Sequence, residues 1–140
     1  NPTGKVLGLA DWKRLFDHAD RYGYVIAADE CYSEIYFDEA QPPLGALTAA
    51  VQLGRSDFRN LVVFSSNPSH VPKGALFALF PDNNAMGRHL AQQLRKPASA
   101  SARLLPLEQL DTAINIRTAD HLGLGLSAGD ARFDMVFPNR

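Results

Sequence analysis

Hydrophobic side chains in the first part of the chain recur with the spacing of an amphipathic helix. From Ala10 onward they fall at i, i+3, i+4 and i+7, and this spacing predicts that one face of the helix is buried. The residues of that face are Trp12, Leu15, Phe16 and Ala19. Gly23 stands where a left-handed C-terminal cap is expected, so the helix is predicted to end at Tyr22.

Two continuous apolar runs, at residues 24–28 and 61–64, predict buried strands. A weaker helical pattern at residues 47–53 lies between these two runs. The order helix, strand, helix, strand is typical of an α/β fold in which helices flank a parallel-rich sheet. We therefore assign the first half of the chain to the α/β class.

Polar residues directly follow both predicted strands. Asp29 and Tyr32 come after the first strand, and Ser65 and Ser66 come after the second. In open sheets of this kind, ligands bind beyond the carboxyl ends of the strands. We therefore expect these four side chains to face one crevice and treat them as candidate site residues. For Asp29 an alternative interpretation stays open, in which its carboxylate only caps a neighbouring turn.

The second half of the chain has a less regular pattern. Residues 75–80 are apolar enough for a third strand, and residues 84–94 show helical spacing after a capping signal. Residues 96–103 are low in complexity and predict a linker. From Leu104 onward, short apolar patches are interrupted by glycine without a firm periodicity. The C-terminal part is therefore expected to be irregular.

Composition narrows the possible classes of function. A chain of 140 residues suits one domain, and its net charge of −1 gives no electrostatic argument for nucleic acid or an anionic membrane as partner. No apolar run approaches the ~20 residues that cross a bilayer. Cys31 is the only cysteine, which excludes an internal disulfide and is typical of the reducing cytoplasm. The four histidines are scattered, so no metal site is expected.

Two motifs in the first half carry a resemblance to a known family. They are Asn-Pro-Thr-Gly at residues 1–4 and Asp-Glu-Cys-Tyr at residues 29–32, separated by one predicted helix and one predicted strand. Together they resemble the class I and II aminotransferases, which are pyridoxal phosphate (PLP) enzymes of fold type I. The stretch is especially similar to succinyldiaminopimelate aminotransferases, and the resemblance extends over residues 1–66. It implies a slice of the large cofactor-binding domain of such an enzyme.

The resemblance also implies an activity and its partners. Family members are cytoplasmic homodimers that transfer an amino group between an amino acid and a 2-oxo acid, in this case in the synthesis of lysine and diaminopimelate. They use PLP as cofactor and are nearly three times as long as this chain. Because the chain also lacks an initiator Met and begins inside a motif, we expect it to be a fragment of a longer protein.

The family pattern assigns a role to five positions of this sequence. Asn1 and Tyr32 match the residues that contact the phenolic oxygen of PLP, and Asp29 matches the aspartate that pairs with the pyridine nitrogen. Ser65 and Ser66 match the beginning of a Ser-x-Ser-Lys segment. In the family, the serines of that segment help to bind the phosphate, and its lysine forms the Schiff base.

The resemblance ends where this lysine belongs. After Ser66 the chain continues with Asn-Pro-Ser-His-Val-Pro-Lys-Gly, in which no lysine follows at the family's position. Either two residues have been lost from the loop, or Ser69 stands at the lysine position. A frameshift or a fusion near Asn67 would explain the abrupt change, and residues 67–140 therefore stay unassigned.

Lys73 is the nearest amine that could replace the missing one. It stands between Pro72 and Gly74, so we expect it on an exposed turn. A lysine that forms a Schiff base requires burial or cationic neighbours, and nothing local to Lys73 supplies either. Lys73 is therefore only a weak substitute candidate, and no catalytic residue is assigned.

The sequence thus supports two hypotheses about function, one for an enzyme-derived fragment and one for a non-enzymatic protein. The principal one is an aminotransferase fragment that keeps part of a PLP site and is inactive alone, so that its status as an enzyme stays open. The alternative is a non-enzymatic interaction module that self-associates through exposed sheet edges. An active PLP enzyme that uses Lys73 is a minor third possibility.

Overall fold

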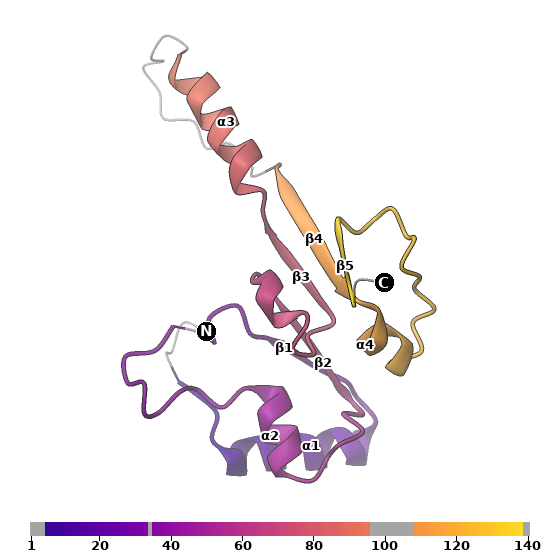
Figure 1. Cartoon of the computed structure of the whole chain (residues 1–140). Helices are drawn as coiled ribbons and strands as arrows, with labels where there is room; N and C mark the ends of the chain where they lie inside the picture. Colours follow the sequence, from indigo (N-terminus) through magenta and orange to yellow (C-terminus); the bar gives the residue numbers. More distant parts are fainter. Residues whose placement is uncertain (1–4, 34, 96–107, 139–140) are drawn as a thin grey trace.

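The computed structural model describes residues 5–33, 35–95 and 108–138. Its elements in chain order are α1 (Leu9–Tyr22), β1 (Ile26–Asp29), α2 (Ala46–Gln52), β2 (Leu61–Ser65), the 3-10 turn η1 (Pro68–His70), β3 (Phe77–Pro81), α3 (Asn83–Leu94), β4 (Leu110–Asn115), α4 (Ile116–His121) and β5 (Met135–Phe137). The strands form one sheet in the order β1-β2-β3-β4-β5 (Figure 1). Neighbouring strands are parallel except β3 and β4, which are antiparallel. The predicted α/β class and parallel-rich sheet are confirmed.

Helix α1 forms where the spacing of hydrophobic residues predicts it. Trp12, Phe16 and Ala19 are buried, whereas Leu15 is only partly buried. At the N-terminus the Asp11 carboxylate accepts a hydrogen bond of 3.2 Å from the backbone N–H of Gly8. At the C-terminus Gly23 has φ 70°, the left-handed conformation that glycine adopts without steric cost.

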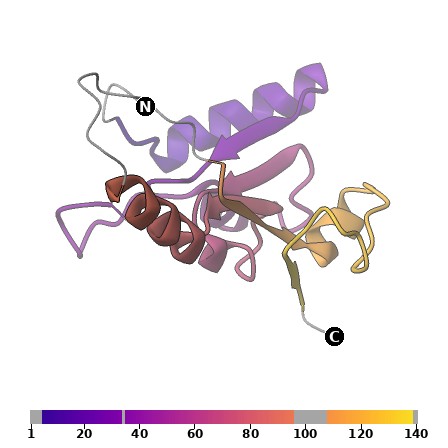
Figure 2. The same cartoon turned by 90° about the horizontal axis from the view of Figure 1, so that it is seen from above.

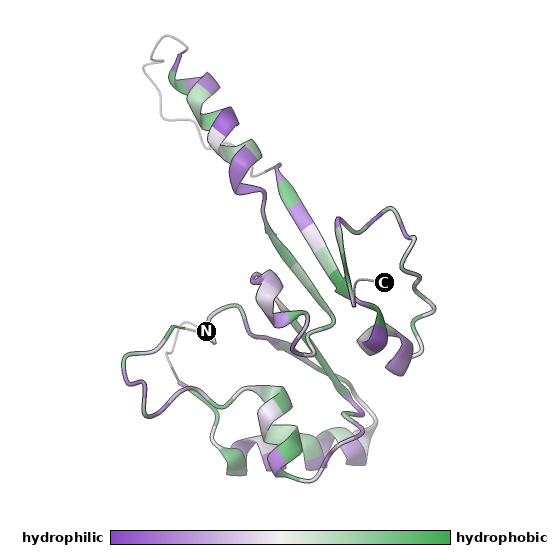
Figure 3. Cartoon of the chain, viewed as in Figure 1, coloured by the Kyte–Doolittle hydropathy of each residue, from purple (hydrophilic) through white to green (hydrophobic). Residues whose placement is uncertain are grey.

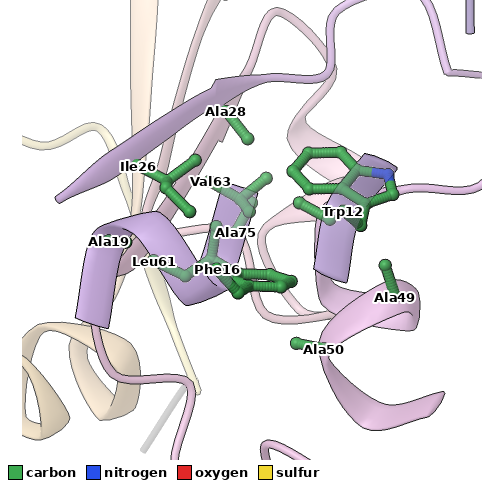
Figure 4. Packing of buried hydrophobic residues seen from close by; sticks show 11 residues of the cluster. Trp12, Phe16, Ala19, Ile26, Ala28, Ala49, Ala50, Leu61, Val63 and Ala75 are labelled. Carbon is green, nitrogen blue, oxygen red and sulfur yellow. The ribbon is translucent and has the colours of Figure 1, made fainter. Parts of the chain in front are cut away.

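The largest hydrophobic core lies between the sheet and helices α1 and α2. Figure 4 shows side chains from α1, α2, β1 and β2 meeting there. The strand register pairs Ile26 with Leu61 and Ala28 with Val63, so the buried side chains of β1 and β2 lie side by side on this face. The two helices thereby cover one face of β1 and β2 and hold the carboxyl ends of both strands in place.

The second half of the chain continues the same sheet. The sequence shows no firm periodicity after Leu104, and the expectation of an irregular C-terminal part is corrected by β4, α4 and β5. In β4 the buried residues are confined to 113–115 at its end, so the strand carries neither strict alternation nor a long apolar run. β4 forms because both of its edges are paired, with β3 and with β5. The predicted linker at 96–103 lies outside the described residues.

Helix α3 stands apart from the rest of the molecule. In both views it lies away from α1, with the strands between them (Figures 1 and 2). It has no buried residue, and Leu94 is 86% exposed. Figure 3 shows hydrophilic and hydrophobic residues alternating along α3, unlike the largely hydrophobic β3. Within the described part of the chain, no helix is long and apolar enough to span a membrane.

Candidate functional site

The candidate site lies at the carboxyl end of β1, beside the N-terminus of α2. Asp29, the last residue of β1, and Tyr32 in the following turn both line one pocket of about 470 Å³. Trp12 from α1 and Lys5 line the same pocket. Tyr32 thus lies beyond the end of a parallel strand, as predicted, whereas Asp29 is the last residue of that strand and not the first residue after it.

Asp29 both caps a turn and lines the pocket, the two alternatives that the sequence left open. Its Oδ1 accepts a hydrogen bond of 3.2 Å from the backbone N–H of Cys31, so the carboxylate does stabilise the turn after β1. The side chain is nevertheless exposed and lines the pocket. Tyr32 is 62% exposed and can present its hydroxyl to a ligand. Cys31 is half-buried and forms no disulfide.

Glu30, next to Asp29, has a structural role that the sequence analysis did not identify. Its Oε1 accepts a hydrogen bond of 2.5 Å from the backbone N–H of Ala46, the first residue of α2. A Cβ atom on Gly45 would lie 2.9 Å from Glu30 Oε2, so a side chain at position 45 would displace the carboxylate. The only sign of this contact in the sequence is a glycine directly before a short helical pattern. The partner acid could not be chosen from sequence, because it lies 16 residues away.

Ser65 and Ser66 follow the adjacent strand but do not line the pocket of Asp29 and Tyr32. Ser65 is only 4% exposed, and its Oγ lies 2.9 Å from Nδ1 of the buried His70. The same Oγ accepts a hydrogen bond of 3.1 Å from the backbone N–H of Asn67. Ser65 thus holds the loop after β2 in its conformation. Ser66 is exposed.

The remaining candidates lie elsewhere. Asn1 lies outside the described residues. Lys73 is exposed on the turn before Gly74, which has φ 118°, and it lines a different pocket from Asp29 and Tyr32. The structure thus brings together two of the five positions that the resemblance singled out. Among the described residues, no group of three His, Cys, Asp or Glu side chains could hold a metal ion.

The side chains described above fit the ring of PLP but not its phosphate. Asp29 offers a carboxylate for a protonated ring nitrogen, and Tyr32 offers a hydroxyl for the phenolic oxygen, both in one pocket. At the phosphate end, the Ser65 hydroxyl is buried and already bonded to His70 and Asn67. The described residues therefore fit the ring but do not form a complete phosphate site.

Comparisons with known proteins concern the same half of the chain. Residues 1–66 match the model of the family described as aminotransferase class I and II. A putative aminotransferase, AatC, of Rhizobium meliloti is 42% identical over 43 residues, and an LL-diaminopimelate aminotransferase of Aquifex aeolicus is 44% identical over 43 residues. Each match covers 31% of this chain and only 11% of the relative.

One solved structure is also similar. It is the crystal structure of an aminotransferase from Neisseria meningitidis, which has 59% sequence identity over 47% of this chain and 16% of that chain, with a TM-score of 0.44. This chain therefore corresponds to a small part of the proteins that it resembles.

Proposed function

We propose that this chain, whose residues 1–66 belong to the class I and II aminotransferase family, keeps the ring-binding part of a PLP site but does not catalyse transamination on its own. One observation carries the first part: Asp29 and Tyr32 line a single pocket at the carboxyl end of β1. The second part rests on the loop after β2, in which no lysine follows at the family's position.

Each remaining site residue has a defined task in this proposal. The Asp29 carboxylate would keep the ring nitrogen protonated, and the Tyr32 hydroxyl would donate to the phenolic oxygen, with Asn1 as a second donor there. Ser65 and Ser66 are the family's phosphate-binding positions, and Ser65 would have to give up its bond to His70 to serve there. When bound, PLP supplies an electron sink for chemistry at the α-carbon of an amino acid.

The loss of activity follows from the missing lysine. That residue is both the covalent anchor of the cofactor and the group that moves the proton at the substrate. A hollow of about 270 Å³ that Lys73 lines shares Glu30, Ser33, Pro43 and Gly45 with the pocket of Asp29 and Tyr32. Lys73 itself is exposed on a turn and does not line that pocket. We therefore propose no catalytic role for Lys73.

The parent enzyme's role is proposed from the relatives. Two of them bear the names LL-diaminopimelate aminotransferase and putative aminotransferase. We infer a parent that acted on an amino acid and a 2-oxo acid in lysine biosynthesis, as a cytoplasmic homodimer. Restoring Ser-Leu-Ser-Lys after Ser66 is not expected to rescue transamination, because the phosphate end of the site would still be incomplete.

The experiment that tests this proposal compares two aspartates that each accept a hydrogen bond from the backbone N–H two residues further along the chain. Asp38 accepts a hydrogen bond from Ala40 N, as Asp29 does from Cys31 N, but it does not line the pocket. PLP binding is measured by absorbance titration, and borohydride reduction with mass spectrometry then locates any lysine bonded to PLP. We expect Asp29→Ala to weaken binding about tenfold, because a charge-assisted bond is lost, and Asp38→Ala to leave it unchanged.

Two results would contradict the proposal. Equal PLP affinities of the Asp29→Ala and Asp38→Ala variants would mean that the pocket does not hold the ring. Turnover of glutamate with a 2-oxo acid, or a dominant PLP adduct at Lys73, would mean that the chain is an enzyme after all.

A second candidate function is self-association through the edge of the sheet. β1 pairs with β2 on one side and with no described strand on the other. Val25, next to β1, is 60% exposed, and an unprotected edge of this kind can pair with another chain. Sedimentation of the chain and of Val25→Lys tests it. Dimers that the substitution dissociates would support this function, and a monomer at all micromolar concentrations would exclude it.

A further inference from the structure

Negative charge exceeds positive charge around the pocket of Asp29 and Tyr32. Of the described residues that line it, Asp29, Glu30 and Lys5 are charged, so two carboxylates stand against one ammonium group. Lys5 already interacts with another group of the chain, and its ammonium also attracts the carboxylate of Asp11 in α1. The other described residues of the wall are mainly hydrophobic. The charge of the pocket therefore favours a ligand that is not an anion.

Three groups in and beside this pocket that could bind a phosphate are already bonded within the chain. The N-terminus of α2 is occupied, because Glu30 Oε1 accepts a hydrogen bond of 2.5 Å from Ala46 N, the first N–H of the helix. The Ser33 hydroxyl, which lines the pocket, donates to the carbonyl oxygen of Glu30 at 3.1 Å. Ser65 is buried and bonded to His70. A phosphate in this place would therefore meet a carboxylate where it needs hydrogen-bond donors.

We propose that this pocket prefers a phosphate-free ligand, a substituted 3-hydroxypyridine such as pyridoxine, over the corresponding 5′-phosphate ester. The inference rests on the proposed function, since Asp29 and Tyr32 hold the ring in both cases. The protonated ring nitrogen brings a positive charge to Asp29, and the hydroxymethyl group of pyridoxine is neutral beside Glu30. A phosphate in the same place carries nearly two negative charges and is repelled by the Glu30 carboxylate.

Pyridoxine and pyridoxine 5′-phosphate test this preference. They differ only in the phosphate, and neither has an aldehyde that could react with a lysine. Calorimetry at neutral pH and low salt measures the affinity of the whole chain for each. We expect pyridoxine to bind roughly fivefold more tightly, which is the effect of one charge repulsion across water. Since salt screens this repulsion, the preference should shrink as the salt concentration rises.

A matched pair of substitutions tests the role of Glu30. Glu30→Gln removes the negative charge but keeps an oxygen that can accept the hydrogen bond from Ala46 N. We expect this variant to lose the preference for pyridoxine. Glu108→Gln changes the net charge equally at an exposed residue that does not line the pocket, so it is expected to keep the preference. Thermal unfolding checks that both variants fold.

The possible results separate this inference from the proposed function. Equal or tighter binding of pyridoxine 5′-phosphate by the original chain, or a preference for pyridoxine that Glu30→Gln does not change, would overturn the inference. If Asp29→Ala weakens the binding of both ligands in that case, the ring site stands and only the preference fails. If neither ligand binds, or if Asp29→Ala weakens neither, the proposed ring site fails as well.

Discussion

Two neighbouring acids at the end of β1 are used in different ways. Both line the pocket, but Asp29 accepts a hydrogen bond from Cys31 N in the turn after β1, whereas Glu30 accepts one of 2.5 Å from Ala46 N and so stabilises the first turn of α2. This arrangement depends on Gly45, because a Cβ atom there would lie 2.9 Å from Glu30 Oε2. The role of Asp29 as a site candidate could be predicted from its place after a strand. The role of Glu30 depends on the path of residues 31–44, which no local pattern specifies.

Replacement of Gly45 by alanine tests this arrangement. We expect Gly45→Ala to lower the free energy of unfolding by about 1–2 kcal/mol, because the displaced carboxylate no longer bonds to Ala46 N. In a Glu30→Ala background the same change should cost much less, since the two sites are coupled. The free energies of unfolding in urea of the original chain, the two single variants and the double variant give this coupling. Gly87→Ala is the control: no atom lies within 4 Å of its added Cβ, so a neutral or stabilising effect is expected.

Elements with strong local signals could be predicted from the sequence, and elements that depend on distant partners could not. The hydrophobic spacing of α1 and the apolar runs of β1 and β2 are confirmed. β4 was not predicted, because its burial is confined to residues 113–115 and its pairing partners lie far away in the sequence. The ion pair between Asp20 in α1 and Arg55 in the turn after α2 likewise could not be predicted from the sequence. Arg55 bonds to both oxygens of Asp20, at 2.6 and 3.0 Å, and lies over the ring of Phe16.

This ion pair makes stability depend on pH. The hydrogen bond from Arg55 is the largest cause that lowers the pKa of Asp20 below its ordinary value of 3.8. The stabilisation is therefore fully present above pH 4 and is lost as the pH falls through the lowered pKa of Asp20. We expect Asp20→Asn to destabilise the chain at pH 7, with a difference from the original chain that shrinks at pH 3 and below.

Denaturant unfolding at several pH values measures this effect. Asp17→Asn is a suitable control, because Asp17 pairs with Lys13 and the two side chains are 58% and 62% exposed. Exposed pairs of this kind contribute little to stability. A difference between Asp20→Asn and the original chain that stays constant down to pH 2 would contradict the assignment.

At the scale of the whole molecule, the sheet is least extensively paired between β2 and β3, and we call this boundary the seam. Only two residue pairs join these strands, Phe64 with Phe77 and Ser65 with Ala78, whereas β3 and β4 are joined by five. The hydrophobic side chains are also divided, with one core under α1 and α2 and two smaller ones along β3 and β4. The family match at residues 1–66 ends beside this seam. The sequence could predict the change of character near Asn67, but not that both halves would share one sheet.

We expect the two sides of the seam to open separately. Backbone amides of β1 and β2, which lie over the largest core, should exchange more slowly with deuterated solvent than those of β4 and β5. Hydrogen exchange followed by mass spectrometry at increasing urea concentrations measures this difference. One common opening free energy for all strands would show that the seam does not divide the molecule.

The attachment of α3 has a consequence for how this sheet could be modified. Pro81 pairs with Leu110, and the N–H of Asp82 donates to the carbonyl oxygen of Gln109 at 3.0 Å, so the chain leaves the sheet and returns to it at one point. No side chain of α3 is fully buried, so this helix adds little to the cores of the sheet. In the terms of protein engineering, β3 and β4 form a hairpin with an exchangeable insert. A two-residue turn could replace this insert, or a foreign domain could be grafted in its place, without a change in strand register.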